Sequence, residues 1–345
     1  MNERLNKYNK TKDILSYTSS TDLIKLMIKG IVGQGYGINS IIDVNDTKIF
    51  IKAIPMTKID LENMYDTSNI HNLPMYYHYG VGSAGFGCWR ELAFHIKASN
   101  WVINNKCPHF PILYHYRIIE NINVATKLKK YKFNKSDFEY WDSNENIELY
   151  IKNRTNTNYF IVMCLEYFPL TLKDTNIIEE NVYWYQKQIL TIILFLKKHE
   201  VIHFDAHLGN ILTDKKILIL TDFGLVLDKS FSLSKQEILF FNRNINYDKA
   251  TLISNISFPI FNYISEPNML KMFEKKYNVD ITNEKEIIYI VFDNLDEIGK
   301  KFNKNYIQIL KKYKNIIVIY NIFLQQFVHS NNKKSIVFPN QQLSF

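Results

Sequence analysis

Two short segments of the sequence carry side chains that suit phosphoryl transfer. The first is HFDAHLGN, which contains Asp205, His207 and Asn210, and the second is DFG, which begins at Asp222. Phosphoryl transfer requires a carboxylate that orients the attacking hydroxyl and accepts its proton, and Mg²⁺ that screens the phosphates. Asp205 is the candidate base, and Asn210 and Asp222 supply hard oxygen ligands suited to Mg²⁺. Gly224 allows a sharp turn after the second metal ligand.

Each of these pieces alone is usually structural. Their order, after a predicted buried helix and between predicted strands, indicates a catalytic loop instead. We expect His203 to organise the backbone of this loop. For His207 two roles stay open, one near the phosphate and one as a structural hydrogen-bonding group.

The elements before the loop read as strands with one helix. Residues 30–54 alternate apolar and polar positions around a glycine turn and a polar turn, which predicts a β-hairpin. Residues 55–87 are too rich in glycine, tyrosine and histidine for a regular element and predict a long ordered loop. Apolar residues at helical spacing then predict an amphipathic helix over residues 89–104.

The rest of the chain predicts two more strands and then mainly helices. The strands are expected at residues 112–119 and 159–165, with a charged, partly helical surface insertion at 129–157 between them. Apolar residues at helical spacing predict a buried helix over residues 179–199, and everything past residue 234 reads as mainly helical. The predicted fold class is therefore α+β.

This arrangement of motifs resembles the protein-kinase-like phosphotransferases. The resemblance covers residues 30–227 and implies ATP and Mg²⁺ as cofactors and a bilobal fold, with an antiparallel sheet and a helix in the N-lobe and a mainly helical C-lobe. It also implies that the glycine hairpin covers the phosphates of the nucleotide. Gly33, Gly35 and Gly37 would supply this hairpin, although their G-x-G-x-G spacing departs from G-x-G-x-x-G.

The resemblance assigns further roles to a lysine and a glutamate. Lys52, in the strand IFIKAI, would hold the α- and β-phosphates, and a glutamate on the following helix would hold the lysine. Glu91 is the first candidate for this glutamate, because it opens the first predicted helix after the lysine strand. Glu62 is a rival candidate.

The segment MCLEYF resembles the hinge of these enzymes. Its backbone groups would bind the adenine ring, which gives Met163, Glu166 and Phe168 a nucleotide-binding role, with Met163 bordering the pocket. The glycine-rich tract at residues 79–87 could be a second nucleotide-contacting loop, since glycines expose backbone N–H groups to phosphate. We favour packing against the first lobe as the role of this tract.

Longer runs, including NLPMYYHYGVGSAGFGCWRELAFH, are similar to a little-described group of serine/threonine-kinase-like proteins from bacteria and large DNA viruses. Three departures from protein kinases stand out. Phe204 replaces the arginine of H-R-D, so gating by a phosphate-to-arginine contact is not expected. His207 replaces a lysine, as in aminoglycoside and choline kinases, and no A-P-E motif follows Gly224.

These comparisons divide the chain into three parts. Residues 1–20 are expected to form a leader, residues 21–166 an N-lobe with the insertion at 129–157, and residues 167–345 a helical C-lobe that carries the catalytic loop and the DFG motif.

Composition excludes several other classes of protein. The 345 residues are 46% hydrophobic and 22% charged, which excludes a disordered chain. The longest apolar stretches are too short to cross a bilayer, the first residues are polar, and the three cysteines fit neither a disulfide framework nor a closed zinc site. We therefore expect an unexported, cytoplasmic protein with no membrane partner. The net charge of +8 is spread over separate lysine groups, so we do not expect a nucleic-acid partner.

The motifs and the resemblance together predict a serine/threonine-kinase-like enzyme that transfers the γ-phosphate of ATP to a hydroxyl group of a protein or a small molecule. Two alternatives stay open, a small-molecule kinase of the aminoglycoside or choline type and a pseudokinase scaffold. The acceptor and the oligomeric state are not predicted.

Overall fold

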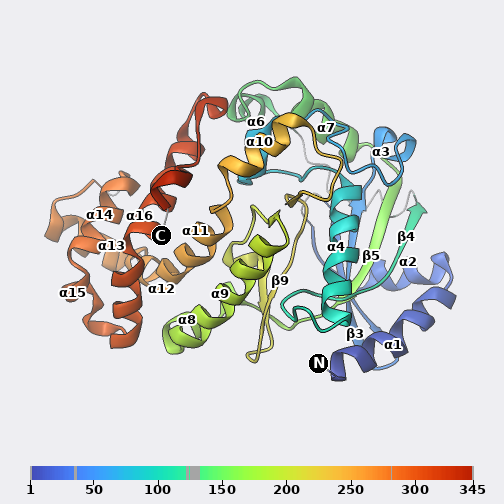
Figure 1. The fold of residues 1–345 in the computed structure, drawn as a ribbon, viewed down its shortest axis with the longest axis horizontal. Helices are drawn as coiled ribbons and strands as arrows, with labels where there is room; N and C mark the ends of the chain where they lie inside the picture. The colour runs from blue at the N-terminus through green and yellow to red at the C-terminus, as the bar shows by residue number, and fades with distance from the viewer. Residues whose placement is uncertain (1, 35–36, 122–123, 125–132, 281, 344–345) are drawn as a thin grey trace. The chain divides into compact units, whose positions relative to one another are not determined.

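The computed structural model describes residues 2–34, 37–121, 124, 133–280 and 282–343 (Figure 1). It has a mixed α+β architecture with an antiparallel five-stranded sheet, so the predicted α+β class is confirmed. The chain forms two compact units. The first comprises Met1–Pro169 and Ile219–Ile238, and the second comprises Leu170–Leu218 and Leu239–Phe345.

The five-stranded sheet of the first unit has the order β1-β2-β3-β5-β4. Its strands are β1 (Ile31–Gln34), β2 (Ile38–Val44), β3 (Thr47–Pro55), β4 (Leu113–Glu120) and β5 (Tyr159–Glu166). The turn between β2 and β3 contains Asn45 and Asp46, both with positive φ angles of 44° and 60°. Asparagine and aspartate tolerate this left-handed conformation better than most residues, which explains the tight polar turn expected between these strands.

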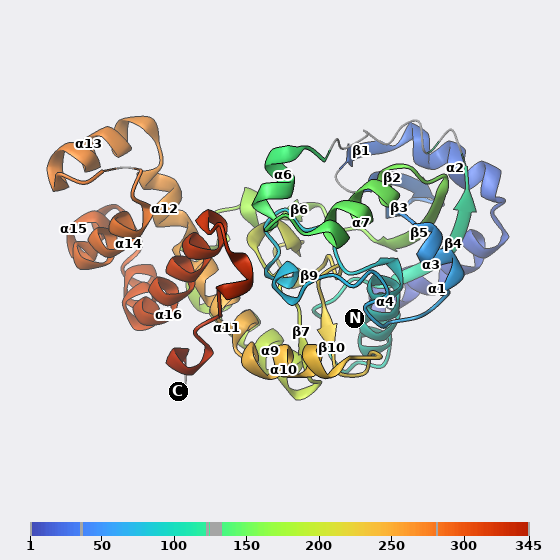
Figure 2. The ribbon, with the colours of Figure 1, turned by 90° about the horizontal axis from the view of Figure 1, so that it is seen from above.

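Helices lie against both faces of this sheet (Figure 2). Helix α4 (Cys88–Ile103) packs on one face, where Trp89 and Leu92 join a buried cluster with Ile54, Ile161 and Met163. Helices α1 (Asn2–Tyr17) and α2 (Ser20–Lys29) lie on the opposite face. Strand residues therefore alternate between two covered surfaces, as the two-residue period of a strand requires.

Helix α1 corrects the prediction of a separate leader at residues 1–20. The guanidinium group of Arg4 forms two bonds with the carboxylate of Glu166, at 2.8 Å and 2.7 Å, and donates to the backbone oxygens of Pro108 and Phe110. Such paired, charge-assisted bonds are strong and directional. The beginning of the chain is therefore part of the first unit.

The prediction of a surface insertion at residues 129–157 is also wrong in part. Residues 129–132 lie outside the described residues, and α6 (Lys135–Tyr140) and α7 (Glu145–Thr155) follow them. Helix α7 buries Tyr150 and Ile151, and the Tyr150 hydroxyl accepts a hydrogen bond from the N–H of Gly87. The charged composition of this segment concealed an apolar face that packs inside the first unit.

The long loop expected at residues 55–87 contains only α3 (Lys58–Glu62) and a short 3₁₀ helix, Met75–Tyr79. The strand β9 (Leu218–Leu220) leads the chain back into the first unit, and β10 (Leu227–Asp228) follows the DFG segment. The sequence placed DFG with the helical part of the chain. In the structure, the ring of Phe223 contacts Phe94 of α4 instead, with the ring centroids 4.7 Å apart.

The second unit is mainly helical. The helix expected at residues 179–199 is α9, and it is preceded by α8 and by strand β6, which pairs with β8. The elements of this unit are β6 (Leu170–Thr171), α8 (Ile177–Glu180), α9 (Val182–Lys198), β7 (Val201–Ile202), β8 (Ile211–Thr213), α10 (Lys235–Arg243, which begins in the first unit), α11 (Tyr247–Ser254), α12 (Phe258–Ile264), α13 (Pro267–Tyr277), α14 (Glu284–Asp293), α15 (Leu295–Ile298) and α16 (Lys304–His329).

Among the described residues, no helix combines the length and the apolar character that a membrane crossing needs. The cysteines Cys88, Cys107 and Cys164 are all buried and free.

Candidate functional site

Lys52 occupies a central position of the sheet in the first unit. It pairs with Met163 in the β3–β5 register, and Phe50 and Ile54, two residues away on either side, belong to or pack against the core beneath α4. Because residues two apart in a strand share a face, the side chain of Lys52 projects on the side of α4. This position brings the amine near the first turn of that helix.

The amine of Lys52 joins two carboxylates that are far apart in the sequence. Its Nζ atom lies 2.6 Å from Oε1 of Glu91 and 2.9 Å from Oδ1 of Asp222. Burial by itself lowers the pKa of Lys52, but the charges of Asp222 and Glu91 outweigh it and raise the pKa above its ordinary value. The lysine therefore stays cationic in its largely buried position.

Glu91, and not its rival Glu62, is the partner of Lys52. Glu91 lies in the first turn of α4 and is 6% exposed. Glu62 ends the short helix α3, and its side chain is exposed and forms an ion pair with Lys58 one turn earlier in the helix. Glu91 reaches Lys52 because its helix, α4, covers the face of the sheet that carries the lysine.

The glycine-rich tract at residues 79–87 packs directly on the DFG segment. The N–H of Phe86 donates to the oxygen of Gly224 at 2.9 Å, and a side chain on Gly85 would come within 2.8 Å of the same oxygen. The N–H groups of Ala84 and Gly87 donate to tyrosine hydroxyls, and that of Gly85 donates to the hydroxyl of Ser83. With these N–H groups already in use, the tract has a packing role, which is the role we favoured.

The predicted glycine hairpin is described only in part. Gly33 lies in β1, and Gly37 lies just before β2, whereas Gly35 falls outside the described residues. A side chain on Gly37 would come within 2.5 Å of the backbone oxygen of Ala53. Gly37 is therefore required by the close approach of β3, and this requirement holds whether or not the hairpin covers a phosphate.

The predicted hinge residues already make structural contacts, and their nucleotide-binding role stays a prediction. The N–H of Glu166 donates to the oxygen of Ile112 at 2.9 Å and its carboxylate binds Arg4, so both groups are already engaged in structural contacts. Met163 is fully buried in the core beneath α4. Phe168 lies beyond the end of β5, and the guanidinium of Arg4 is 5.6 Å from its ring.

In the second unit, the catalytic-loop candidates Asp205 and Asn210 contact each other. The side-chain nitrogen of Asn210 donates to Oδ2 of Asp205 at 2.8 Å and to the backbone oxygen of Asp205 at 2.9 Å. The N–H of Asp205 donates to Nδ1 of the fully buried His203 at 3.2 Å. His203 thus supports the backbone of the loop, as its sequence position indicates.

His207 forms a structural hydrogen bond, which is one of the two roles that the sequence left open, and its role near a phosphate stays a prediction. Its Nδ1 atom accepts a hydrogen bond from the N–H of Gly209 at 3.0 Å, which stabilises the turn. Its Nε2 atom lies 3.7 Å from Oδ1 of Asp205, and the side chain is 57% exposed. The ring is therefore fixed by a structural bond while its other nitrogen faces the candidate base.

Sequence reasoning missed Asp248, whose carboxylate binds the backbone at the start of the predicted catalytic loop. Its carboxylate accepts the N–H groups of His203 at 2.6 Å and of Phe204 at 3.0 Å. Phe204 has a φ of +64°, which is strained for a bulky residue, and its ring packs against Phe240 and Tyr247. An aspartate inside the apolar helix α11 is the sequence signal that could have revealed this support.

The environment of Asp248 predicts a measurable pH dependence. Burial raises the pKa of Asp248 to about 7, although its two backbone hydrogen bonds oppose the shift. The pKa of an aspartate in the unfolded chain is lower, so folding is coupled to proton uptake at any pH between the unfolded and the folded pKa. The stability that this group contributes therefore falls as pH rises towards 7. Relative to Asp248→Asn, the wild type should lose about 1.4 kcal/mol of unfolding free energy per pH unit between about pH 5 and pH 6.5. Urea unfolding of both proteins across this range measures the difference, and parallel pH profiles would contradict it.

The donor atoms at the predicted metal ligands suit a hard cation. Asn210 uses its amide nitrogen for Asp205, so its amide oxygen is the atom that can bind a cation. Asp222 offers a carboxylate that is 42% exposed and already held by Lys52. Oxygen ligands of this kind are those that Mg²⁺ prefers. Among the described residues, no group of three or more histidine, cysteine, aspartate or glutamate side chains gathers as a metal site.

Comparison of the sequence with known proteins identifies no family and no curated relative. A function for this chain therefore depends on the chemistry of the two clusters, Lys52, Glu91 and Asp222 in the first unit and Asp205, His207 and Asn210 in the second.

Proposed function

We propose that this protein is an ATP- and Mg²⁺-dependent phosphotransferase with a bilobal protein-kinase-like fold, which transfers the γ-phosphate of ATP to a hydroxyl group. The observation that carries the proposal is the amine of Lys52, held between Glu91 at 2.6 Å and Asp222 at 2.9 Å. A buried lysine that remains charged is suited to binding phosphate oxygens. Glu91 orients this lysine, and Asp222 would supply an oxygen ligand for Mg²⁺.

The cluster around Asp205 supplies the other half of the chemistry. Phosphoryl transfer needs little covalent assistance, so catalysis comes from positioning and from neutralising charge. Asp205, oriented by the amide of Asn210, accepts the proton of the acceptor hydroxyl. Asn210 and Asp222 would hold Mg²⁺, which supplies positive charge beside the phosphates when it is bound.

The support beneath the loop favours an enzyme without phosphate-dependent gating. Phe204, which stands where protein kinases have arginine, is 2% exposed and packed against Phe240 and Tyr247. Asp248 holds the adjacent backbone at the same time. The loop is thus ordered by contacts within the chain that need no phosphorylation. We therefore expect constitutive activity.

The direct test measures Mg²⁺-dependent release and transfer of γ-phosphate from labelled ATP by the purified chain. Asp222→Ala should abolish both, because it removes a metal ligand and one partner of Lys52. Asp214→Ala is the matched control, since Asp214 is an exposed aspartate in the turn after β8. The proposal fails if wild-type protein consumes no ATP, or if Asp222→Ala retains full activity; a chain that binds ATP without consuming it would be the pseudokinase alternative.

A pair of lysine variants on β3 tests nucleotide binding separately from chemistry. Lys52→Met should weaken the binding of Mg²⁺-ATP by about 10-fold or more, since charge-assisted bonds contribute about 1.5–3 kcal/mol each. Lys48→Met is the control, because Lys48 lies on the same strand and its exposed side chain forms an ion pair with the exposed Asp43. Titration of a fluorescent ATP analogue measures both. Equal affinities in the two variants would remove Lys52 from the site.

A further inference from the structure

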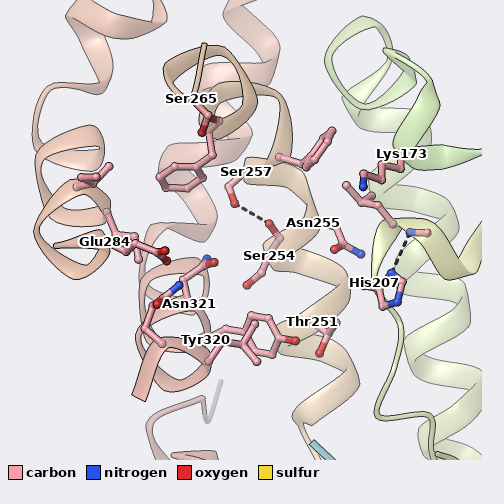
Figure 3. Close-up of a pocket in the computed structure, with 18 of the residues that line it drawn as sticks. Lys173, His207, Thr251, Ser254, Asn255, Ser257, Ser265, Glu284, Tyr320 and Asn321 are labelled. Atoms are coloured by element: carbon pink, nitrogen blue, oxygen red, sulfur yellow. Dashed lines mark hydrogen bonds between the residues drawn. The ribbon is translucent and has the colours of Figure 1, made fainter. Parts of the chain in front are cut away.

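The second unit contains a cavity of about 620 Å³ beside the catalytic loop (Figure 3). One wall consists of His207, Leu208 and Gly209 of that loop. The other walls come from α11 and α12 with the turn between them, from the beginning of α14 and from α16. This volume lies within the range of small-molecule sites, about 300–1,000 Å³.

Ser254 gives this cavity an unsatisfied polar group. It lies at the end of α11 and is 6% exposed, and its hydroxyl has no hydrogen-bond partner among the described residues. Figure 3 shows the side chain directed towards the part of the cavity where Tyr320 and Asn321 of α16 lie. A buried hydroxyl without a partner costs free energy. A polar ligand in the cavity would remove that cost.

The remaining polar lining is almost entirely uncharged. It consists of hydroxyl and amide side chains, among them Thr251, Ser257, Tyr320, Asn321 and Gln325. Apart from His207, the ionisable groups of opposite charge are one lysine and one glutamate, Lys173 and Glu284, and both are exposed. Their formal charges cancel, so the lining does not favour a polycation such as an aminoglycoside.

Apolar side chains complete the walls. Phe258 and Phe261 of α12 and Leu324 of α16 lie among the polar groups of the lining. Interspersed hydroxyl or amide groups and apolar faces suit a ligand that has hydroxyl groups on a carbon framework. A sugar or a polyol has this chemistry, because its hydroxyl groups can bond to Ser254 while its C–H faces contact the rings.

The cavity is lined by a neighbour of the candidate base. His207 belongs to its wall, and the Nε2 atom of His207 is 3.7 Å from Oδ1 of Asp205. Asn255, another lining residue, donates to the backbone oxygen of Ala206 at 2.9 Å and so holds the loop against this wall. A bound ligand would therefore lie beside His207, the residue that faces the group proposed to accept the proton.

We infer that this cavity binds the acceptor of the reaction, an uncharged polyhydroxylated small molecule of the sugar or polyol class; the acceptor role rests on the proposed phosphotransferase function. In the transfer, the acceptor hydroxyl oxygen forms a bond to the γ-phosphorus of ATP as the bond from that phosphorus to the β–γ bridging oxygen breaks. The hydroxyl proton passes to Asp205, and ADP leaves with the bridging oxygen.

Binding is tested first without nucleotide, so that the cavity and the activity are judged separately. Saturation-transfer NMR on the full chain uses glucose, sorbitol and myo-inositol as uncharged probes and kanamycin and choline as cationic ones. Gln325→Trp should fill the cavity and abolish binding of the uncharged probes. Gln326→Trp is the matched control, because Gln326 is the next residue of α16, is exposed and does not line the cavity.

Ser254→Ala tests the polar contact itself. It should weaken binding of an uncharged probe by about 3-fold to 10-fold, as expected for one hydrogen bond, and leave thermal stability unchanged or higher, since a hydroxyl without a partner is removed. A loss of stability with unaltered binding would overturn the role of Ser254 in the site.

Addition of ATP and Mg²⁺ then separates the two levels of the inference. A new phosphomonoester of an uncharged probe, lost in Gln325→Trp and kept in Gln326→Trp, supports both. Binding of an uncharged probe with no ATP consumption supports the cavity and overturns the phosphotransferase function. Preference for the cationic probes, or no binding of any uncharged probe at millimolar concentration, overturns the assigned ligand class, even if ATP is consumed or a protein is phosphorylated.

Discussion

Asp205→Asn is expected to reduce phosphoryl transfer by about 10²-fold to 10⁴-fold, the usual contribution of a general base. The substitution keeps the size of the side chain and leaves an oxygen that can accept the amide hydrogen of Asn210, which bonds to Asp205 at 2.8 Å. It removes the negative charge that takes the acceptor proton. The affinity for Mg²⁺-ATP should stay nearly unchanged, because phosphate binding is assigned to Lys52 and to the metal ligands.

This experiment compares transfer of γ-phosphate and binding of a fluorescent ATP analogue in the same protein preparations. Asp214→Asn serves as the control, since it makes the same chemical change at an exposed aspartate of the second unit. Unchanged turnover in Asp205→Asn would refute the assignment of the base. A parallel loss of nucleotide binding would instead show that Asp205 belongs to the binding site and not to the proton-transfer step.

Arg90→Met is expected to lower the free energy of unfolding by about 3–5 kcal/mol, because it leaves a buried carboxylate without its partner. Arg90 follows Trp89 in α4 and lies 2.5 Å from Glu237, and both side chains are 1% exposed. The same guanidinium donates to the oxygen of Thr67 and lies over the rings of Phe86 and Phe231. One substitution therefore disrupts several contacts of the first unit.

The double variant Arg90→Met/Glu237→Gln identifies the cause of this loss. Glutamine removes the buried charge and keeps an oxygen for the N–H of Ser234, which Glu237 accepts at 2.8 Å. Most of the lost stability should therefore return. Arg243→Met, at an exposed position of the same helix α10, should have little effect. Urea denaturation of the wild type and these three variants measures the differences, and a single Arg90→Met variant as stable as the wild type would contradict the prediction.

The Arg90 contact also bears on the site. Arg90 is adjacent to Glu91, and its bonds to Thr67 and Glu237 restrain the first turn of α4. Glu91 lies in that same turn and orients Lys52. Any Arg90→Met protein that remains folded should therefore lose nucleotide affinity as well as stability. The double variant should regain most of the stability but less of the nucleotide affinity.

Several features of the two units could be predicted from local patterns. Alternating residues around Lys52 predict its strand, and helical spacing after Gly87 predicts the helix that carries Glu91. The short separation of Asp205 and Asn210 likewise places both side chains in one loop. These inferences succeed because the two-residue and 3.6-residue periods are set by backbone geometry within a single element.

Other features depended on contacts between distant residues. The hinge prediction assigned Glu166 to a nucleotide, yet Arg4 occupies its carboxylate across 162 positions of the chain. The charged segment at 129–157 hid the buried face of α7, and the support given by Asp248 to Phe204 has no motif of its own. Such pairings arise from packing, which a local pattern does not encode.

By itself, the sequence determined which side chains can perform chemistry and which periodic elements carry them, because those properties belong to short stretches of backbone. Only the tertiary structure decided that Glu91 and not Glu62 contacts Lys52, that Glu166 is engaged by Arg4, and that a largely uncharged cavity adjoins His207. The physical reason is that partner choice and cavity shape follow from the burial of faces far apart in the chain, where the closest packing and the pairing of buried charges select one arrangement.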